Sequence, residues 1–378
     1  MKSIIAHIID TYLDISATFI YGYITNLQKY KVILLTKETT NLEVFPFKNL
    51  YCAPRFRRYS LQWIWDKSCQ KMLKRELYYE YIIKREKVRL IHAHFGPNGV
   101  RILRTKKRLG LPLITTFYGY DMSRLVQQKK WRKAYKKLFR EGDFFLVEGS
   151  HMKRDMISLG CSPQKIKIQH IGVDINKFKY QERKLKNNDS KIRVLFCGRF
   201  TEKKGLIYGL KAIKIVTEKF PNLEFRIIGD GELRSEIEHF IKEENMQRSV
   251  VLLGYQPHYV FLEEAQKADI LLQPSVTAKN GDSEGGAPTV LLEAQATGLP
   301  VISTYHADIP EVVMDGKSGF LVPERNPETI ASKLEYLIKN PELWIEMGKY
   351  GRKHIEENYN IYKEVKKLED IYSQFIRK

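Results

Sequence analysis

The feature that most constrains this chain is a rhythm of short apolar runs separated by helical patterns, and it occurs twice. The first half carries the rhythm from residue 3 to residue 147, and it restarts after residue 191. Apolar runs that alternate with amphipathic segments predict parallel strands joined by helical crossovers. We therefore predict two Rossmann-like, doubly wound α/β domains with a central cleft, where ligands bind beyond the carboxyl ends of the strands.

The expected elements follow from this rhythm. Strands are predicted at 3–9, 31–36, 90–93, 113–117, 144–147, 193–197, 224–228, 249–253, 269–275 and 299–304. Helices are predicted at 205–219, 232–244, 259–267 and 361–377. Because 378 residues exceed what one core normally supports, we expect domains at 1–180 and 192–358. The polar stretch 181–191 is the predicted linker, and 359–378 is a terminal helix expected to pack back on the first domain.

The net charge of +20 is unevenly distributed. Residues 1–180 hold 35 Lys and Arg against 14 Asp and Glu, whereas residues 181–378 hold 29 against 30. All of the excess therefore lies in the first half. This asymmetry predicts that the first domain meets an anionic partner and that the second need not.

Two further features bear on the compartment. The four cysteines (Cys52, Cys69, Cys161 and Cys197) form no CxxC pair, which indicates a reducing cytosol rather than a disulfide framework or a zinc site. No apolar run approaches the roughly 20 residues that span a bilayer. His7 and Asp10 interrupt the apolar N-terminus, so we interpret it as a first strand rather than a secretion signal.

Segments 55–89 and 124–140 combine cations with aromatic residues. In the second, Trp131, Tyr135 and Leu138 recur at helical spacing beside several Lys and Arg residues. Such a helix can lie on an anionic membrane surface; the alternative is that its aromatic residues pack on its own sheet. Nucleic acid would also satisfy the charge, but no RNP, helix-turn-helix or zinc pattern is present, so that partner is disfavoured.

A polar, glycine-rich loop joins the expected strands 269–275 and 299–304. It carries a carboxylate at each end, Glu284 and Glu293, and runs into a helix that Pro288 is expected to begin. A loop at the start of a helix offers free N–H groups and a positive dipole end to an anion. The alternative is an ordinary strand-to-helix turn with solvated glutamates.

Two more strand-to-helix turns accompany it. The turn 198–205 contains Arg199 and Lys204, a planar fork and a point charge that suit phosphate, in a domain without excess charge. The turn 228–232 contains Gly229 and Gly231, which would let the backbone approach a ligand or would serve only the tight turn.

Together these motifs resemble the donor domain of glycosyltransferase family 4, the retaining, nucleotide-sugar-dependent enzymes of GT-B architecture. The motifs are Gly198-Arg-Phe-x-x-Lys-Lys-Gly205, Ile228-Gly-Asp-Gly231, Glu284-Gly-Gly-Ala-Pro-x-x-Leu-Leu-Glu-Ala294 and Ile309-Pro-Glu311. The first half adds Ser16-Ala-Thr-Phe-Ile20, His92-Ala-His-Phe-Gly96, Thr116-Phe-Tyr-Gly-Tyr-Asp121 and His170-Ile-Gly-Val-Asp174. This set is similar to members that build bacterial exopolysaccharide, of the colanic acid and amylovoran type.

The resemblance implies a role for each matching residue. Arg199 and Lys204 would neutralise the leaving diphosphate, Glu293 would hold the ribose hydroxyls, and Glu284 the donor sugar. The remaining donor-side residues would cap the phosphates or line the nucleotide: Gly198, Gly229, Gly231, Gly254, Gly285, Gly286, Ala287, Pro288 and Thr289. Acceptor-side residues would be Ser16, Thr18, His94 and Asp121.

The same resemblance implies a front-face displacement without a protein nucleophile, cofactor or metal ion, and the sequence has no Asp-x-Asp pair. The implied partners are a nucleoside diphosphate sugar, a lipid-linked saccharide and an anionic membrane surface. The enzyme is expected to be cytoplasmic and peripheral at the inner face of the cell membrane.

Two positions depart from the family pattern. The carboxylates are one residue further apart than usual, so either the loop bulges at Gly285-Gly286, which we favour, or Gly285 takes the place of Glu284. The family's active-site histidine is Tyr118, which can donate a hydrogen bond but does not shuttle protons near neutral pH. Tyr118 would then orient a ligand, or would merely pack beside Phe117.

Several histidines lie beside these motifs. We expect His92 and His94 to face opposite sides of a strand end, so that one of them could point toward the ligand, although a structural role for both is favoured. A structural role is also favoured for His151, His170 and His306.

The departures leave other functions open. An epimerase or hydrolase that acts on nucleotide sugars could use the same architecture. A protein without enzymatic activity that binds nucleic acid through its basic half is the alternative from another class.

Overall fold

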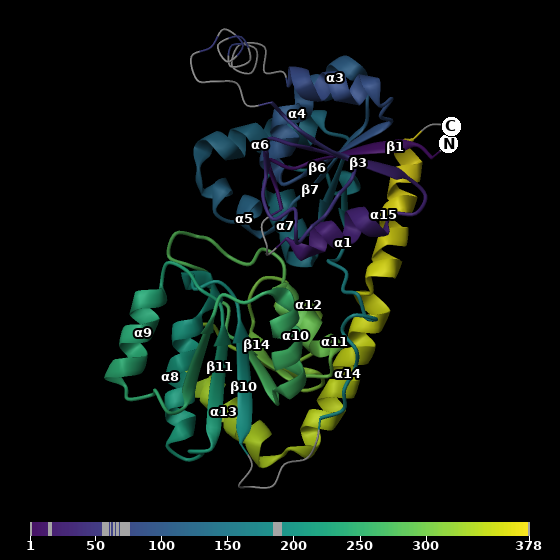
Figure 1. The fold of residues 1–378 in the computed structure, drawn as a ribbon. Helices are drawn as coiled ribbons and strands as arrows, with labels where there is room; N and C mark the ends of the chain where they lie inside the picture. Colours follow the sequence, from purple (N-terminus) through teal and green to yellow (C-terminus); the bar gives the residue numbers. More distant parts are fainter. Residues whose placement is uncertain are drawn as a thin grey trace. The chain divides into compact units, whose positions relative to one another are not determined.

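The computed structural model describes residues 2–13, 17–54, 76–183 and 191–376, together with positions 60, 62, 65 and 68. The chain divides into two compact units. Unit 1 comprises residues 1–172 and 361–378, and unit 2 comprises residues 173–360 (Figure 1). The boundary therefore falls after Gly172, whereas the sequence predicted residue 180. Of the linker expected at 181–191, residues 184–190 lie outside the described residues.

Unit 1 contains a seven-stranded sheet in the order β5-β3-β1-β6-β7-β8-β9, in which every neighbouring pair is parallel. The strands are β1 Ile4–Ile8, β3 Lys31–Thr36, β5 Leu50–Cys52, β6 Leu90–His94, β7 Leu113–Thr116, β8 Phe144–Val147 and β9 Ile166–Ile168. A separate pair, β2 Thr11–Tyr12 and β4 Glu38–Thr39, is also parallel.

Helices cover both faces of this sheet. One core cluster contains side chains of α3 Leu77–Arg85, α4 Gly96–Leu109, α6 Lys129–Glu141 and α7 Ser150–Ser158. The opposite cluster contains α1 Thr18–Asn26 and α15 Ile361–Phe375, which lie side by side (Figure 1). The C-terminal helix thus packs on unit 1, because Ile361, Val365 and Leu368 are buried against the sheet and α1.

Unit 2 contains a six-stranded parallel sheet in the order β12-β11-β10-β13-β14-β15. Its strands are β10 Ile192–Cys197, β11 Leu223–Ile228, β12 Val250–Gly254, β13 Ile270–Gln273, β14 Val301–Thr304 and β15 Gly319–Val322. Its helices are α8 Leu206–Thr217, α9 Arg234–Glu243, α10 His258–Lys267, α11 Thr289–Ala296, α12 Ile309–Val312, α13 Pro327–Lys339 and α14 Glu342–Asn358.

The strand order of unit 2 reverses between β10 and β13, which are neighbours although three helices separate them in the chain. Loops that leave the carboxyl ends of two such strands diverge, and open α/β sheets bind ligands at that point. The turns 198–205 and 274–288 leave these two strands. The topology therefore brings together the two loops that the sequence singled out.

Glu369 of α15 should contribute to the stability of unit 1, because its buried carboxylate accepts N–H groups of both Gln28 and Lys29 at 2.6 Å. We expect Glu369→Ala to lower the free energy of unfolding by about 2 kcal/mol, since two donors lose a charged acceptor. Thermal unfolding measures this. Lys366→Ala, an exposed change on the same helix, should leave the transition unchanged; equal effects of both changes would contradict the assignment.

Candidate functional site

The turn after β10 carries both cations that the sequence predicted for phosphate. Arg199 is exposed, and no hydrogen bond or ion pair of its side chain occurs among the described residues. Lys204 lies at the end of a short 3-10 turn, Glu202–Lys204, and is directed inward, with its Nζ 2.9 Å from Oε2 of Glu284. Arg199 is therefore available to an anionic ligand, whereas Lys204 already has a carboxylate partner.

Glu284 is held on both of its oxygens. Oε2 accepts from Lys204, and Oε1 accepts from the hydroxyl of Ser275 at 2.8 Å. Its side chain is only 6% exposed. Burial opposes ionisation, but the charges of Lys204 and Lys203 hold the pKa of Glu284 below its usual value. The carboxylate is thus ionised and is fixed beside Lys204 and Lys203.

In the glycine-rich loop, Gly285 has φ of +74°. This left-handed conformation suits glycine, and the Gly285 N–H turns back to the Ser283 hydroxyl at 3.2 Å. Glu284, the residue before it, contacts Lys204; that the loop takes up the extra residue between the two glutamates here stays a prediction. Lys203 supports the same loop through Asp282 and the carbonyl of Ser283.

A buried histidine fixes the backbone of Glu284. The Glu284 N–H donates to Nε2 of His306 at 3.1 Å, and Nδ1 of His306 lies 2.7 Å from Oε1 of Glu324. Because a backbone N–H can only donate, Nε2 is the acceptor, and Nδ1 carries the proton that Glu324 accepts. His306, for which we favoured a structural role, thereby positions a predicted site residue.

Glu293 lies inside α11 and is 8% exposed. Its Oε1 is 3.0 Å from Nε2 of His258, and Nδ1 of His258 is 3.0 Å from Nζ of Lys177. Pro288 is the N-cap of α11, and Thr289 is its first residue. The expectation that Pro288 occupies the first helical position was wrong by one residue; its backbone is extended, with ψ of 130°.

Gly229 serves the packing of two turns. A Cβ built at this position would lie 1.9 Å from the carbonyl oxygen of Gly198, and φ is +147°. The tight-turn interpretation therefore accounts for this glycine without a ligand. Gly231, with φ of +157°, similarly approaches the backbone of Phe200. Gly254, at the end of β12, has open space around it.

The residues predicted for the acceptor side belong to unit 1. Ser16 lies outside the described residues, and Thr18 is the first residue of α1. Tyr118 directs its hydroxyl to Nδ1 of His94 at 2.8 Å, and its ring contacts Phe19 and Phe95. Tyr118 does not pack beside Phe117, because the two side chains belong to core clusters on opposite faces of the sheet.

Asp121 ties two backbone segments together. Its carboxylate accepts the N–H of Gly96 at 2.6 Å and the N–H of Tyr118 at 2.8 Å. It is the third residue of the short helix α5, Gly119–Met122, where it forms a capping box with Tyr118. Burial raises the pKa of Asp121 to about 7, against the lowering effect of these N–H groups.

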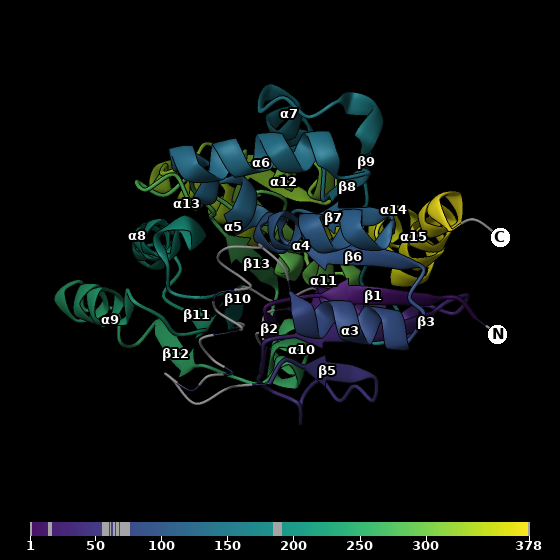
Figure 2. The same ribbon diagram turned by 90° about the horizontal axis from the view of Figure 1, so that it is seen from above.

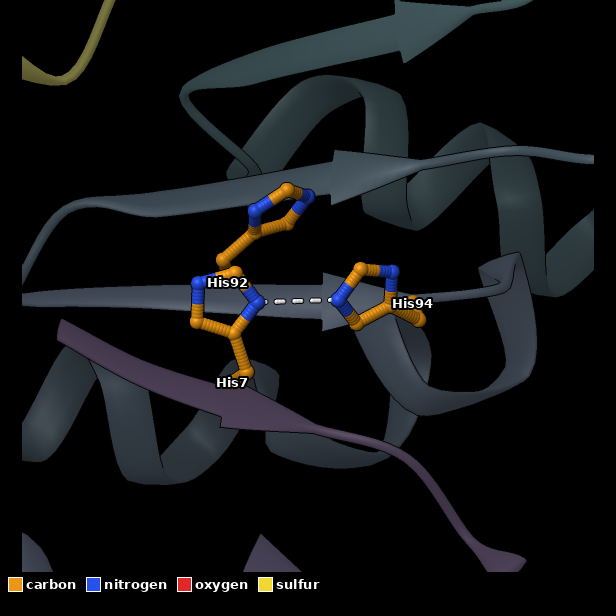
Figure 3. Close-up of side chains that lie close together, drawn as sticks. All are labelled: His7, His92 and His94. Atoms are coloured by element: carbon orange, nitrogen blue, oxygen red, sulfur yellow. Dashed lines mark hydrogen bonds between the residues drawn. The ribbon is translucent and has the colours of Figure 1, made fainter. Parts of the chain in front are cut away.

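His92 and His94 lie on the same side of β6 and stack on each other, with ring centroids 4.7 Å apart. The expectation that they face opposite sides was wrong, because residues two apart in a strand share a face. His7 of β1 joins them, and its Nδ1 is 2.9 Å from Nε2 of His94 (Figure 3). All three lie where the strand order of unit 1 reverses between β1 and β6.

These rings form a buried hydrogen-bonded chain. It runs from Tyr118 through His94 and His7 to Tyr372 of α15, and on to His92 and Thr116. Burial lowers the pKa of all three histidines, that of His94 to about 3, so the rings stay neutral.

The three histidines also offer ligand nitrogens within 4.8 Å of one another. A tetrahedral zinc site with bonds of about 2.0–2.1 Å would separate its nitrogens by roughly 3.3 Å. The 2.9 Å contact between His7 and His94 is shorter, and His92 already uses both nitrogens on Tyr372 and Thr116. The arrangement is that of hydrogen bonding rather than of a coordination sphere.

The basic segment 124–140 forms α6, and its aromatic residues pack inward. Tyr135 and Leu138 are fully buried, and Trp131 packs against the same core, as the alternative interpretation expected. Helix α4 runs beside α6 (Figure 2). Between them lies a cavity of about 490 Å³, lined by Arg101, Arg104, Lys130, Lys133, Lys136, Lys137 and Arg140 with Val100, Leu103 and Ala134. Of the other basic segment, 55–89, the structure describes residues 76–89, which include α3, and positions 60, 62, 65 and 68.

Sequence reasoning missed four residues that support the site: Ser275, His258, Glu324 and Lys203. Lys203 stood within the quoted motif beside Lys204, but spacing alone does not show which lysine is turned toward which loop. Ser275 ends an expected strand. His258 and Glu324 had no sequence signal, because their partners lie 35 and 18 residues away.

Comparisons with known proteins identify the family of the chain. The family model described as glycosyl transferases group 1 matches residues 177–354, and the model of glycosyltransferase family 4 matches residues 27–177. Among the described residues, no helix is both long enough and apolar enough to cross a bilayer.

The relatives among curated proteins include several with activity names. The putative colanic acid biosynthesis glycosyltransferase WcaL of Salmonella typhimurium is 34% identical over 64% of this chain and 59% of its own length. The amylovoran biosynthesis glycosyltransferase AmsK of Erwinia amylovora is 32% identical over 74% of this chain and 68% of its own length. An Escherichia coli UDP-Gal:alpha-D-GlcNAc-diphosphoundecaprenol alpha-1,3-galactosyltransferase is 25% identical, with 78% of each chain covered.

Solved structures show the same fold. Anabaena HepE in complex with UDP and glucose has a TM-score of 0.78 and 14% identity, with 98% of this chain and 99% of that chain covered. The two parallel sheets of this protein are thus the two Rossmann-like domains of a GT-B architecture.

The pKa of Asp121 leads to a pH-dependent stability. Because its folded pKa of about 7 lies above its ordinary value of 3.8, the folded state binds this proton more tightly than the unfolded state. The contribution to stability is fully present below pH 4 and is lost as pH rises to 7, by roughly 3–5 kcal/mol. Asp121→Asn should flatten unfolding free energy against pH in this window. A curve parallel to that of the wild type would contradict the shift.

Proposed function

Because the chain belongs to glycosyltransferase family 4, we propose that it transfers a sugar from a nucleoside diphosphate sugar to a saccharide acceptor. The observation that carries this proposal is the contact of Lys204 with Glu284, which joins the turn that also bears Arg199 to the glycine-rich loop where the strand order of unit 2 reverses. Two cations in a unit without excess charge suit a diphosphate. The carboxylates beside them suit the hydroxyl groups of a sugar and a ribose.

The cations would act on the leaving group. As the bond between the anomeric carbon and the phosphate oxygen breaks, negative charge grows on the diphosphate. Arg199 would meet it with a planar fork and Lys204 with a point charge. The first N–H groups of α11, beginning at Thr289, would add the positive end of a helix dipole.

We propose retention at the anomeric carbon and transfer without a metal ion. The acceptor oxygen would attack from the face that the diphosphate leaves, and a departing phosphate oxygen would take the acceptor proton. This route needs no protein nucleophile. The arginine and lysine supply charge that a metal ion supplies in other enzymes.

The acceptor is proposed to be a lipid-linked saccharide used in exopolysaccharide synthesis. The names of WcaL and AmsK support the pathway class, and the diphosphoundecaprenol named for the Escherichia coli relative supports the acceptor class. An acceptor with a diphosphate head and a membrane-embedded tail also accounts for a strongly basic first half. Among the described residues, no particular contact supports nucleic acid binding. None supports the epimerisation or hydrolysis of a nucleotide sugar either.

We place the enzyme at the anionic inner face of the cell membrane. The cavity between α4 and α6 is lined by seven cationic and three apolar residues, and of the cations Arg101 is paired with Asp10 and Glu76. Anionic headgroups attract such side chains by about 1 kcal/mol each. The aromatic residues of α6 are buried in unit 1, so this contact would be made by the cationic side of α6 rather than by its aromatic stripe.

Arg199→Ala tests the phosphate role. We expect it to weaken binding of the preferred nucleoside diphosphate, chosen from a panel by thermal shift, by about 10- to 100-fold, as for the loss of charged hydrogen bonds. Isothermal titration calorimetry measures this. Arg248→Ala, which removes an exposed cation of unit 2 before β12, should change nothing. Unaltered binding by the Arg199 variant would refute the assignment.

The combined change Lys133→Glu and Lys136→Glu tests the membrane surface. We expect it to lower binding to vesicles that contain phosphatidylserine by at least tenfold, because two cations of the cavity become anions. Co-sedimentation at low and high salt measures this, and salt should weaken wild-type binding. The matched control is Lys211→Glu with Lys242→Glu, two exposed lysines of unit 2. Equal losses of vesicle binding in both double variants would show that only the net charge of the protein matters, and would contradict a membrane surface at the cavity.

A further inference from the structure

We infer that His258 is a positioning residue for Glu293: it fixes one carboxylate oxygen and leaves the other to the ribose of the donor. The inference rests on the proposed function, because it deepens the assignment of Glu293 as the ribose-binding carboxylate. Both residues belong to unit 2, where His258 begins α10 and Glu293 lies within α11.

The contacts at both ends of His258 define its tautomer. The Lys177 ammonium can only donate, so Nδ1, 3.0 Å away, is the acceptor. The Glu293 carboxylate, when ionised, can only accept, so Nε2 carries the proton that it receives at 3.0 Å. The two constraints agree on a neutral imidazole that is protonated on Nε2.

The ring itself is held in place. The Phe178 ring meets it edge to face, with centroids 5.6 Å apart, and the Phe261 ring stacks at 6.1 Å. Phe178 and Phe261 are both buried. The imidazole is therefore fixed by packing as well as by its two hydrogen bonds, which is what a positioning residue requires.

Glu293 needs such support because of its place in the fold. Every residue of α11 from Val290 to Ala296 is buried, so its carboxylate lies at the edge of a packed core. The His258 N–H engages Oε1. This bond restrains the plane of the carboxylate, and Oε2 has no hydrogen-bond partner among the described residues. Two adjacent ribose hydroxyls could therefore donate to Oε2.

The experiment compares two carboxamides that differ only in reach. In His258→Gln, the side-chain amide can place its N–H near the position of Nε2, and nucleoside diphosphate affinity should stay within about threefold of the wild type. In His258→Asn, the amide is too short to reach Glu293, and affinity should fall about tenfold. Calorimetric titration with the nucleoside diphosphate preferred by the wild type measures both.

Two further measurements separate position from folding and from the proposed function. His239→Asn, which breaks an exposed His–Glu contact of 3.0 Å on α9, is the matched control and should bind like the wild type. In a cycle with Glu293→Gln, the loss from His258→Asn should shrink to less than threefold, because the two residues act as a unit. Thermal unfolding without ligand should be alike for the Gln and Asn variants.

The outcomes are distinct. Equal affinity of the wild type, Gln and Asn variants would overturn the inference while the nucleotide site stands. Equal losses for the Gln and Asn variants, or full additivity with Glu293→Gln, would also overturn it, since reach would then be irrelevant. Absence of nucleoside diphosphate binding by the folded wild type would instead refute the proposed function.

Discussion

The contact on which the donor side depends is the buried ion pair between Lys204 and Glu284. It joins the turn after β10 to the loop before α11, which are separated by 80 residues in the chain. Removing one partner of such a pair leaves an uncompensated charge at a cost of about 3–5 kcal/mol. The pair therefore holds two loops together at the point where the strand order reverses. A ligand that binds Lys204 or Glu284 must replace the contact that the residue makes with its partner.

The same topological rule organises both units. In each sheet the first strand is central, and the order reverses beside it, between β1 and β6 in unit 1 and between β10 and β13 in unit 2. Unit 1 fills its reversal point with neutral histidines that bond to one another. Unit 2 fills its own with charges and their partners. One architecture thus holds a neutral, buried network in unit 1 and a charged, mostly buried one in unit 2, beside which Arg199 is exposed.

The strands were predictable because buried parallel strands are continuous apolar runs. Lys31–Thr36 and Phe144–Val147 match the expected bounds, and β14 begins two residues late. The strands β5 and β9, with three residues each, were not predicted, because so few residues give no periodicity. The four residues of β15 were also missed. The predicted site loops do meet in unit 2, since the topology was correct. Their roles as ligand contacts remain predictions.

What sequence could not supply is the direction of individual side chains. The quoted motif contains Lys203 and Lys204 side by side, yet Lys203 holds Asp282 while Lys204 holds Glu284. His258 and His306 each fix a carboxylate residue from a different element, through contacts that no spacing rule contains. These supporting residues neutralise or orient their partners locally, while Arg199 is exposed and has no charged partner among the described residues. A diphosphate that binds Arg199 would therefore reach Lys204 only by competing with the Glu284 carboxylate.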